Sequence, residues 1–386
     1  MPIQLLPARP RYSRPRGLPL PAPAPPSAPA TQAATPRPAA PGDGAPAAGE
    51  LVDRYGRVVA DLRVSLTDRC TLRCAYCMPP EGLPWLPRAE LLTDDEIVRL
   101  VGIAVRLGVG AVRLTGGEPL LRPGVPALIS RLAALRPRPE LSVTTNGLLL
   151  RRDAGTLAEA GLDRVNVSLD TLDPARFRAI TFRDRHAEVL DGLAAAREAG
   201  LEPVKVNAVL LRGINDSEAP ALLRWALEAG YALRFIEQMP LDAQHSWDRA
   251  QMITAAEVLT VLRAEFTLAP VPAPGRGSAP AESWVVEDGP GRDRWRLDPP
   301  MVGVVGSVTR PFCGACDRLR LTADGQLRNC LFAREESDLR TPLRADVSDE
   351  ELVDRFRLAV GAKRAGHGID DPGFLQPARP MSAIGG

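Results

Sequence analysis

The sequence predicts an α/β fold, a partial (βα)6 TIM-like barrel followed by a C-terminal extension. Six short β-type runs alternate with helical segments between residues 62 and 237, a pattern typical of parallel sheets. Polar residues gather where these runs end, and parallel β/α barrels place their chemistry at the C-terminal ends of strands. Because six units are fewer than the eight of a closed barrel, we expect an open, partial barrel.

The first predicted helix has the clearest start, because it carries a capping box. Thr93 and Glu96 have the spacing at which side chains and backbone amides satisfy one another, and spaced apolar residues follow from Ile97 to Ala104. The helical segments lie between strands predicted at LRVSL (62–66), AVRLT (111–115), LSVTT (141–145), RVNVSLD (164–170), PVKVNAVLL (203–211) and LRFIE (233–237).

Composition divides the chain into three parts. The first 48 residues hold 14 of the 39 prolines, and such a segment cannot bury enough apolar surface to offset the entropy of ordering it. Residues 1–49 are therefore predicted to be a disordered tail, residues 50–270 the barrel and residues 271–386 the C-terminal region. A second Pro/Gly-rich stretch, from Val271 to Gly291, is interpreted as an irregular excursion.

Charge and hydropathy argue against several classes of partner. The net charge is +1, so no overall field favours nucleic acid, and any anion site must be local. No run of about 18 apolar residues is present to cross a membrane. The arginines before Asp43 fit a transit peptide, but Arg outnumbers Lys 46 to 2 throughout the chain, so compositional drift is the simpler explanation. A cytoplasmic protein is expected.

The first of two cysteine triplets directly follows the first predicted strand. Cys70, Cys74 and Cys77 have CxxxCxxC spacing, which suits three corners of a [4Fe-4S] cluster. A protein that only carries electrons would normally fill the fourth corner with another cysteine. The open iron therefore suggests that a small molecule binds there, as S-adenosylmethionine (SAM) does in radical SAM enzymes.

The second triplet is Cys313, Cys316 and Cys330, a CxxC pair followed by a third cysteine. No cysteine is left over, and a chain of 386 residues without an apolar signal segment favours metal ligation over disulfides. Structural zinc is the alternative for both triplets, and a closer one for the second, but it usually has four protein ligands. None of the three histidines adjoins a triplet; they are His186, His245 and His367.

Two further motifs end predicted strands. In TGGEP (115–119), two glycines permit close backbone approach to a ligand, and Glu118 could pair with an ammonium group. Ser168 could hydrogen-bond a ribose hydroxyl, although a strand-end hydroxyl satisfied by backbone is the ordinary alternative. Each signal is weak alone and gains weight from the cysteines that precede it.

Three cations also suggest a binding role. Lys205 stands inside an apolar strand of a chain that otherwise uses arginine, which indicates either a compact point charge or a snorkelling side chain. Arg318 and Arg320 alternate, so an extended segment turns both to one side. Such a pair suits a phosphate or carboxylate, or forms an ordinary solvated basic face.

Eight segments carry a family resemblance: DLRVSLTDRCTLRCAYCMP, TGGEPLLR, TTNG, NVSLD, VKVN, RFIEQMP, FCGACDRLRLTADG and RPMSAIGG. In this order they resemble the GTP 3′,8-cyclases, radical SAM enzymes that begin molybdenum cofactor biosynthesis. The resemblance runs from about Leu51 to Gly386. It implies a partial barrel of the radical SAM type with a C-terminal iron–sulfur extension, and the cyclisation of GTP to 3′,8-cyclo-7,8-dihydroguanosine 5′-triphosphate.

The resemblance also implies roles for residues at matching positions. Each cysteine triplet would hold a [4Fe-4S] cluster, and the open iron of the second would face guanine. Contacts to SAM would come from Tyr76, Gly117, Ser168 and Met239. GTP would be bound by Arg63, Arg113, Thr144, Lys205, Arg318, Leu319 and Arg320, while Arg234, Gly385 and Gly386 would complete the catalytic site.

The implied chemistry begins with a 5′-deoxyadenosyl radical that removes the H3′ hydrogen of GTP, after which the C3′ radical attacks C8 of guanine. The implied partners are a flavodoxin- or ferredoxin-like electron donor, a downstream cyclic pyranopterin monophosphate synthase and a second copy in a homodimer. Asp317 departs from the family, which commonly has a neutral residue there, although alternation should turn it away from both neighbouring arginines. The rival interpretations are a radical SAM peptide-modifying enzyme and a zinc-bearing binding module.

Overall fold

The computed structural model describes residues 49–272 and 277–385. The predicted tail, apart from Gly49, and the predicted site residue Gly386 lie outside the described residues. The described residues form one sheet of twelve strands in the order β12-β11-β10-β1-β2-β3-β4-β5-β6-β9-β8-β7. Because its two ends are different strands, the sheet is open, which confirms the predicted partial barrel.

The six predicted strands are confirmed, and they lie side by side in chain order. Each pairs in parallel with the next one along the chain. The observed bounds differ from the predicted ones by at most two residues: β1 (Asp61–Ser65), β2 (Ala111–Thr115), β3 (Glu140–Thr145), β4 (Arg164–Ser168), β5 (Lys205–Val209) and β6 (Ala232–Ile236).

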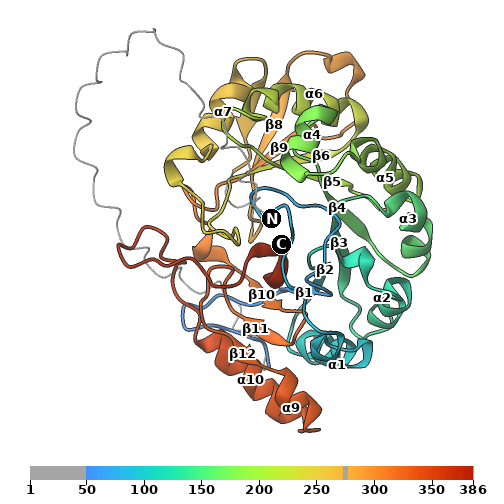
Figure 1. The fold of residues 1–386 in the computed structure, drawn as a ribbon, viewed down its shortest axis with the longest axis vertical. Helices are drawn as coiled ribbons and strands as arrows, with labels where there is room; N and C mark the ends of the chain where they lie inside the picture. Colours follow the sequence, from blue (N-terminus) through green and yellow to red (C-terminus); the bar gives the residue numbers. More distant parts are fainter. Residues whose placement is uncertain (1–48, 273–276, 386) are drawn as a thin grey trace, which may run out of the picture. The chain divides into compact units, whose positions relative to one another are not determined.

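Helices cover the outer face of these strands, as Figure 1 shows for α1, α2, α3 and α5. The predicted capping box begins α1: Thr93 N donates to Glu96 Oε2 at 2.7 Å, and Glu96 N donates to Thr93 Oγ1 at 3.2 Å. Apolar strand residues such as Leu62 and Val64 are fully buried. The helices are α1 (Asp94–Arg106), α2 (Val125–Ala133), α3 (Leu150–Glu159), α4 (Pro174–Thr181), α5 (His186–Glu198) and α6 (Ala219–Ala229).

The C-terminal region adds strands to both sides of the barrel, a pairing that the sequence pattern does not predict. β10 (Arg318–Leu321) pairs in parallel with β1, and β9 (Met301–Val305) pairs in parallel with β6. The predicted excursion at Val271–Gly291 is wrong in part, because β8 (Glu282–Asp288) lies within it and pairs with β9. The other elements are α7 (Ala255–Arg263), β7 (Thr267–Pro270), β11 (Gln326–Arg328), β12 (Ser337–Asp338), α9 (Arg340–Arg344), α10 (Asp349–Gly361) and α11 (Met381–Ile384).

The strand register gathers polar residues on the inner face of the sheet. Arg63 of β1 is aligned with Arg113 of β2 and with Arg320 of β10, and Asn166 of β4 is aligned with Lys205 of β5. Side chains alternate along a strand, so the apolar neighbours of these residues face the helices. Since barrel interiors are usually filled by branched apolar side chains, this polar inner face indicates a binding site.

Candidate active site

The loop that carries the first cysteine triplet is fixed against the end of β2. Gly117 N donates to Thr67 O, and Glu118 N donates to Arg69 O, both at 2.7 Å. A Cβ atom on Gly117 would clash with the carbonyl oxygen of Arg69. Glycine is therefore required there for the two backbones to touch, so the glycine motif positions the cysteine loop itself.

The first triplet opens onto a pocket of about 160 Å³. Tyr76, one of its lining residues, is held in place because its hydroxyl donates to Asp170 Oδ2 at 2.8 Å, while Asp170 Oδ1 accepts from Val209 N at 2.8 Å. The pocket brings together all the predicted SAM contacts and one predicted GTP contact: its lining includes Cys70, Cys74, Cys77, Tyr76, Gly117, Ser168, Met239 and Thr144.

The chemistry of the first triplet fits an iron–sulfur cluster. Burial raises the pKa of Cys70 to about 11 and that of Cys77 to about 12, and it raises the pKa of Cys74 as well. Neighbouring thiolates reinforce the effect on Cys74 and Cys77, so three thiolates need nearby positive charge, which iron supplies. Within the described ranges, no three His, Cys, Asp or Glu side chains meet as ligands of one metal ion. A cubic cluster instead takes each thiolate on a different iron.

Glu118 does not face this pocket, so its predicted pairing with an ammonium group is wrong. Its side chain is fully buried, and its carboxylate accepts from Leu120 N at 3.1 Å, Thr145 Oγ1 at 2.8 Å and Asn146 N at 2.7 Å. Burial raises the pKa of Glu118 to about 7. The residue joins the end of β2 to the end of β3 and belongs to the scaffold of the site.

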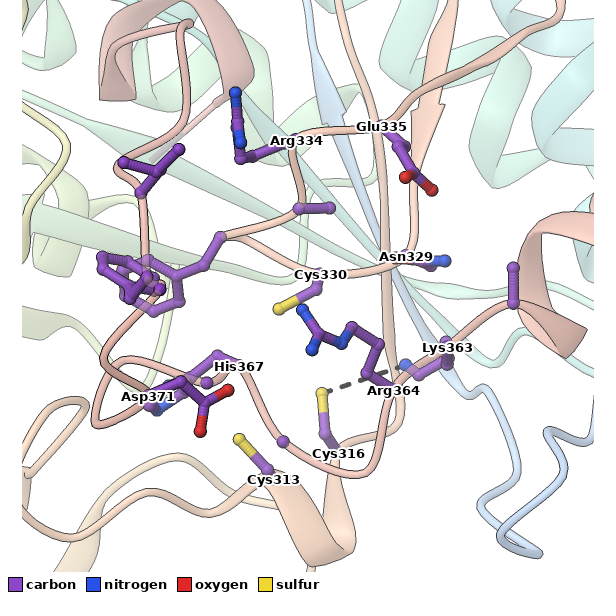
Figure 2. Close-up of a pocket in the computed structure, with 18 of the residues that line it drawn as sticks. Cys313, Cys316, Asn329, Cys330, Arg334, Glu335, Lys363, Arg364, His367 and Asp371 are labelled. Carbon is purple, nitrogen blue, oxygen red and sulfur yellow. Dashed lines mark hydrogen bonds between the residues drawn. The ribbon is translucent and has the colours of Figure 1, made fainter.

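The second triplet lies beside β10 and β11. Cys313 begins the short helical turn η6 (Cys313–Ala315), Cys316 directly follows this turn, and Cys330 follows β11. Figure 2 shows the three sulfur atoms directed into one pocket, which has a volume of about 450 Å³. The same cysteines line a smaller pocket of about 70 Å³ together with the predicted arginine pair. All six cysteines of the chain are free thiols, as metal ligation requires.

Two cations contact Cys316, and one of them was not predicted. Arg318 Nη2 lies 3.8 Å from Cys316 Sγ, and Lys363 Nζ lies 4.0 Å from it. Burial alone would raise the pKa of Cys316, but these two charges, together with hydrogen bonds from Arg318, outweigh burial and lower the pKa. At Cys313 burial prevails and raises the pKa. The chain has only two lysines, so the rarity that singles out Lys205 also singles out Lys363, although Lys363 does not stand in an apolar strand.

The predicted cations converge on the inner face of the sheet. Burial lowers the pKa of Arg63 to about 9, that of Arg113 to about 10 and that of Arg234 to about 10. Burial and neighbouring cations lower the pKa of Lys205 to about 7. Arg164 of β4 adds to this repulsion and was not predicted. Buried positive charge at this density favours a ligand with several negative charges.

Arg320 meets the C-terminal end of the described chain. Its side chain is buried, and its Nη1 donates to the carbonyl oxygen of Gly385. Burial lowers its pKa, and the charges of Arg63 and Arg318 lower it further. The structure therefore places the predicted residue Gly385 against Arg320, one of the predicted arginine pair, whereas Gly386 lies outside the described residues.

Two residues next to the arginine pair differ from their predicted placement. The side chain of Leu319 is fully buried in the apolar core, so only its backbone could reach a substrate. Asp317 was predicted to face away from both arginines, but its Oδ1 lies 3.9 Å from Arg318 Nε. The reason is that Asp317 precedes β10, where strict alternation along a strand does not apply.

Two asparagines on the inner face were also not predicted. Asn166 is fully buried in β4, and within the described part of the chain neither its Oδ1 nor its Nδ2 has a hydrogen-bond partner. The Oδ1 atom of Asn207, in β5, also has no hydrogen-bond partner among the described residues. Buried amide atoms without partners are costly, so these side chains are suited to a ligand. Asn166 lies in register beside Lys205.

The fold and the first triplet define a class of protein, the radical SAM enzymes. The family model described as the Radical SAM superfamily matches residues 64–226, and the model described as Molybdenum Cofactor Synthesis C matches residues 231–369. The structure of Streptococcus suis SuiB bound to precursor peptide SuiA is similar with a TM-score of 0.55 and 14% identity, over 79% of this chain and 67% of that one. This last likeness supports the fold alone.

Relatives in sequence narrow the class to one family. The GTP 3′,8-cyclase of Streptomyces coelicolor is 64% identical over 337 residues, which are 87% of this chain and 96% of that protein. The GTP 3′,8-cyclase 2 of Mycobacterium tuberculosis H37Rv is 59% identical over 342 residues, 88% of this chain and 93% of that protein. The chain therefore belongs to the GTP 3′,8-cyclase family. As a radical SAM enzyme it uses a [4Fe-4S] cluster and SAM, which suit the first triplet. Within the described residues, no helix has the length and apolar character needed to span a membrane.

Proposed function

We infer that this protein catalyses the radical SAM cyclisation of GTP to 3′,8-cyclo-7,8-dihydroguanosine 5′-triphosphate, the first step of molybdenum cofactor biosynthesis. The observation that carries this proposal is the group of buried cations on the inner face of the sheet, which adjoins the second triplet through Arg63, Arg318 and Arg320. A triphosphate supplies the negative charge that such a group favours. The rival peptide-modifying function is supported by a likeness in fold only.

We propose that the two triplets hold separate [4Fe-4S] clusters with different tasks. Cys70, Cys74 and Cys77 hold the cluster that binds SAM, with Tyr76, Gly117, Ser168 and Met239 around it, because all seven residues line one pocket. When bound, this cluster and SAM supply the 5′-deoxyadenosyl radical that removes H3′ of GTP. Cys313, Cys316 and Cys330, which line one pocket, would hold the second cluster, and this cluster would supply a binding site for guanine.

The remaining residues orient GTP between these sites. Arg63, Arg113, Lys205, Arg318 and Arg320 bind the triphosphate, and the backbone of Leu319 lies between the two arginines of β10. Thr144 lines the pocket of the first triplet, so it can contact the part of GTP nearest to SAM. Arg234 and the C-terminal Gly385 and Gly386 complete the catalytic site, which the contact between Arg320 and Gly385 supports.

The partners and the division of the chain follow from the same proposal. Reductive cleavage of SAM needs one electron, which a flavodoxin- or ferredoxin-like donor supplies. The product passes to a cyclic pyranopterin monophosphate synthase. We propose a homodimer, with residues 50–270 as the radical SAM barrel and residues 271–386 as the region of the second cluster. The cytoplasmic location and the disordered tail at 1–49 stay predictions.

Cysteine variants test the proposal. Cys74→Ala should abolish SAM cleavage, because the first cluster loses a ligand. Cys313→Ala or Cys330→Ala should leave some uncoupled SAM cleavage without cyclised product. The measurement is 5′-deoxyadenosine and cyclised nucleotide, quantified by chromatography after anaerobic reconstitution. Near wild-type amounts of cyclised nucleotide from either second-triplet variant would contradict the assignment of two clusters.

A further inference from the structure

Lys363 is a buried lysine that the proposed reaction does not use. Its side chain is only 3% exposed, and lysine is almost never fully buried without a partner. Its Nζ donates to Arg318 O at 2.8 Å and lies 4.0 Å from Cys316 Sγ, which is a contact of hydrogen-bond type to sulfur. Figure 2 shows this contact as a dashed line. One ammonium group therefore joins the end of α10, the start of β10 and a thiol of the second triplet.

The two cations at Cys316 approach the sulfur from different pockets. Lys363 lines the larger pocket of the second triplet, whereas Arg318 lines the smaller one together with Arg320. Arg318 Nη2 lies 3.8 Å from Cys316 Sγ, so the thiolate competes with a bound phosphate for this guanidinium. A second, permanently placed cation at the thiolate reduces that competition. Lys363 has this position, because the carbonyl oxygen of Arg318 holds its ammonium group.

We propose that Lys363 is a positioning residue of the second cluster, which fixes Cys316 and raises the reduction potential of that cluster. The inference rests on the proposed function, because it requires an iron–sulfur cluster on the second triplet. Reduction potentials of such clusters depend on net charge and on hydrogen bonds to the sulfur atoms. A fixed cation stabilises the reduced state more than the oxidised one, because the reduced state carries one more negative charge.

Two substitutions at this position separate charge from packing. Lys363→Met keeps the length of the side chain and removes the charge, while Lys363→Arg keeps a cation. Each is made in the full chain and also in a full chain whose first triplet is changed to Ala, so that only the second cluster gives a signal. After anaerobic reconstitution, iron and sulfide are assayed, and the potential is measured by a redox titration monitored by electron paramagnetic resonance.

Lys363→Met should lower the potential of the second cluster. At a fixed applied potential, we expect the ratio of reduced to oxidised cluster to fall at least tenfold, which corresponds to ~59 mV for a one-electron couple. Lys363→Arg should restore most of the shift. Arg334→Met is the matched control: Arg334 is an exposed cation of the same pocket, and Figure 2 shows its guanidinium directed away from the three sulfur atoms. The second cluster of the Arg334→Met protein should have the same reduction potential as that of the wild type.

The outcomes distinguish this inference from the function on which it rests. An unchanged potential in Lys363→Met, in a protein that holds both clusters, overturns the inference alone. If Lys363→Met loses the second cluster and Lys363→Arg retains it, the role of the charge is supported. If both variants lose the second cluster, that role is overturned. A wild-type protein with iron for only one cluster overturns the proposed function together with the inference.

Discussion

Lys205 should make the affinity for GTP fall as the pH rises above neutrality. Burial, together with the charges of Arg234 and Arg164, lowers its pKa from 10.5 to about 7. In the free protein the ammonium form is therefore lost as the pH rises through 7. A bound triphosphate favours the charged form and raises this pKa. Binding above pH 7 thus requires the uptake of a proton, and each rise in pH makes binding less favourable.

The size of the effect follows from the pKa. With a value of about 7, half of the Lys205 side chains carry the proton at pH 7. At pH 9 roughly 1% carry it, so the affinity for GTP should be roughly 50-fold lower than at pH 7 when the pKa in the complex lies well above 9. The loss is about tenfold for each pH unit in the upper part of this range.

The assay is equilibrium dialysis of GTP against the anaerobic protein between pH 6.5 and 9. Lys205→Arg is the matched control, because a guanidinium holds its proton to a much higher pH than an ammonium group in the same place. Any titration of Arg63, whose pKa burial lowers to about 9, and the ionisation of GTP are common to both proteins. The affinity of Lys205→Arg should fall much less than that of the wild type. Calorimetry in buffers of different ionisation enthalpy should show more proton uptake by the wild type than by Lys205→Arg. Parallel pH profiles for the two proteins would refute the argument.

Two other variants test the binding face and the cysteine loop. Arg320→Ala should weaken GTP binding roughly 10- to 150-fold, because a hydrogen bond to a charged group contributes about 1.5–3 kcal/mol. Equilibrium dialysis measures the affinity, and the control is Arg310→Ala, which removes an exposed ion pair with Glu282. Equal affinities in both variants would count against the phosphate assignment. Gly117→Ala should lower the iron content and destabilise the fold by about 1–3 kcal/mol, because its Cβ clashes with backbone. Gly110→Ala is the control, because its Cβ meets no atom within 4 Å, and its melting temperature should equal that of the wild type. Equal melting temperatures for Gly117→Ala and Gly110→Ala would contradict the predicted clash.

The strands of the barrel could be predicted because local patterns determine them. β2 is the run AVRLT, bounded by glycine before it and after it, and its alternation already separates Val112 and Leu114 from Arg113. β10 was missed because RLRL is only four residues long and its partner β1 lies more than 250 residues earlier in the chain. No local pattern specifies a pairing at that distance, since hydrophobic burial and register decide it.

The residues of the candidate site that the sequence predicts are those of a rare type or in a recognisable motif. Cysteines and glycine-rich turns are rare enough to be noticed, whereas Arg164 is one of 46 arginines and has no motif of its own. Asn166 could have been found from alternation, because it lies between Val165 and Val167, which face the core. Lys363 carried the same signal of rarity as Lys205, but only the structure places it against a cysteine of the second triplet.

The pairing of β10 with β1 explains how one substrate can meet both triplets. The strands are parallel, and Asp61 at the start of β1 is paired with Arg318 at the start of β10. The first triplet follows the end of β1, whereas the CxxC pair of the second precedes the start of β10. The two triplets therefore lie toward opposite ends of a strand pair that is roughly 13 Å long at about 3.3 Å per residue. Arg63 and Arg320 are paired between these ends. A register shift of one residue would turn Arg320 outward and Leu319 inward, so the site requires the C-terminal region in this one register.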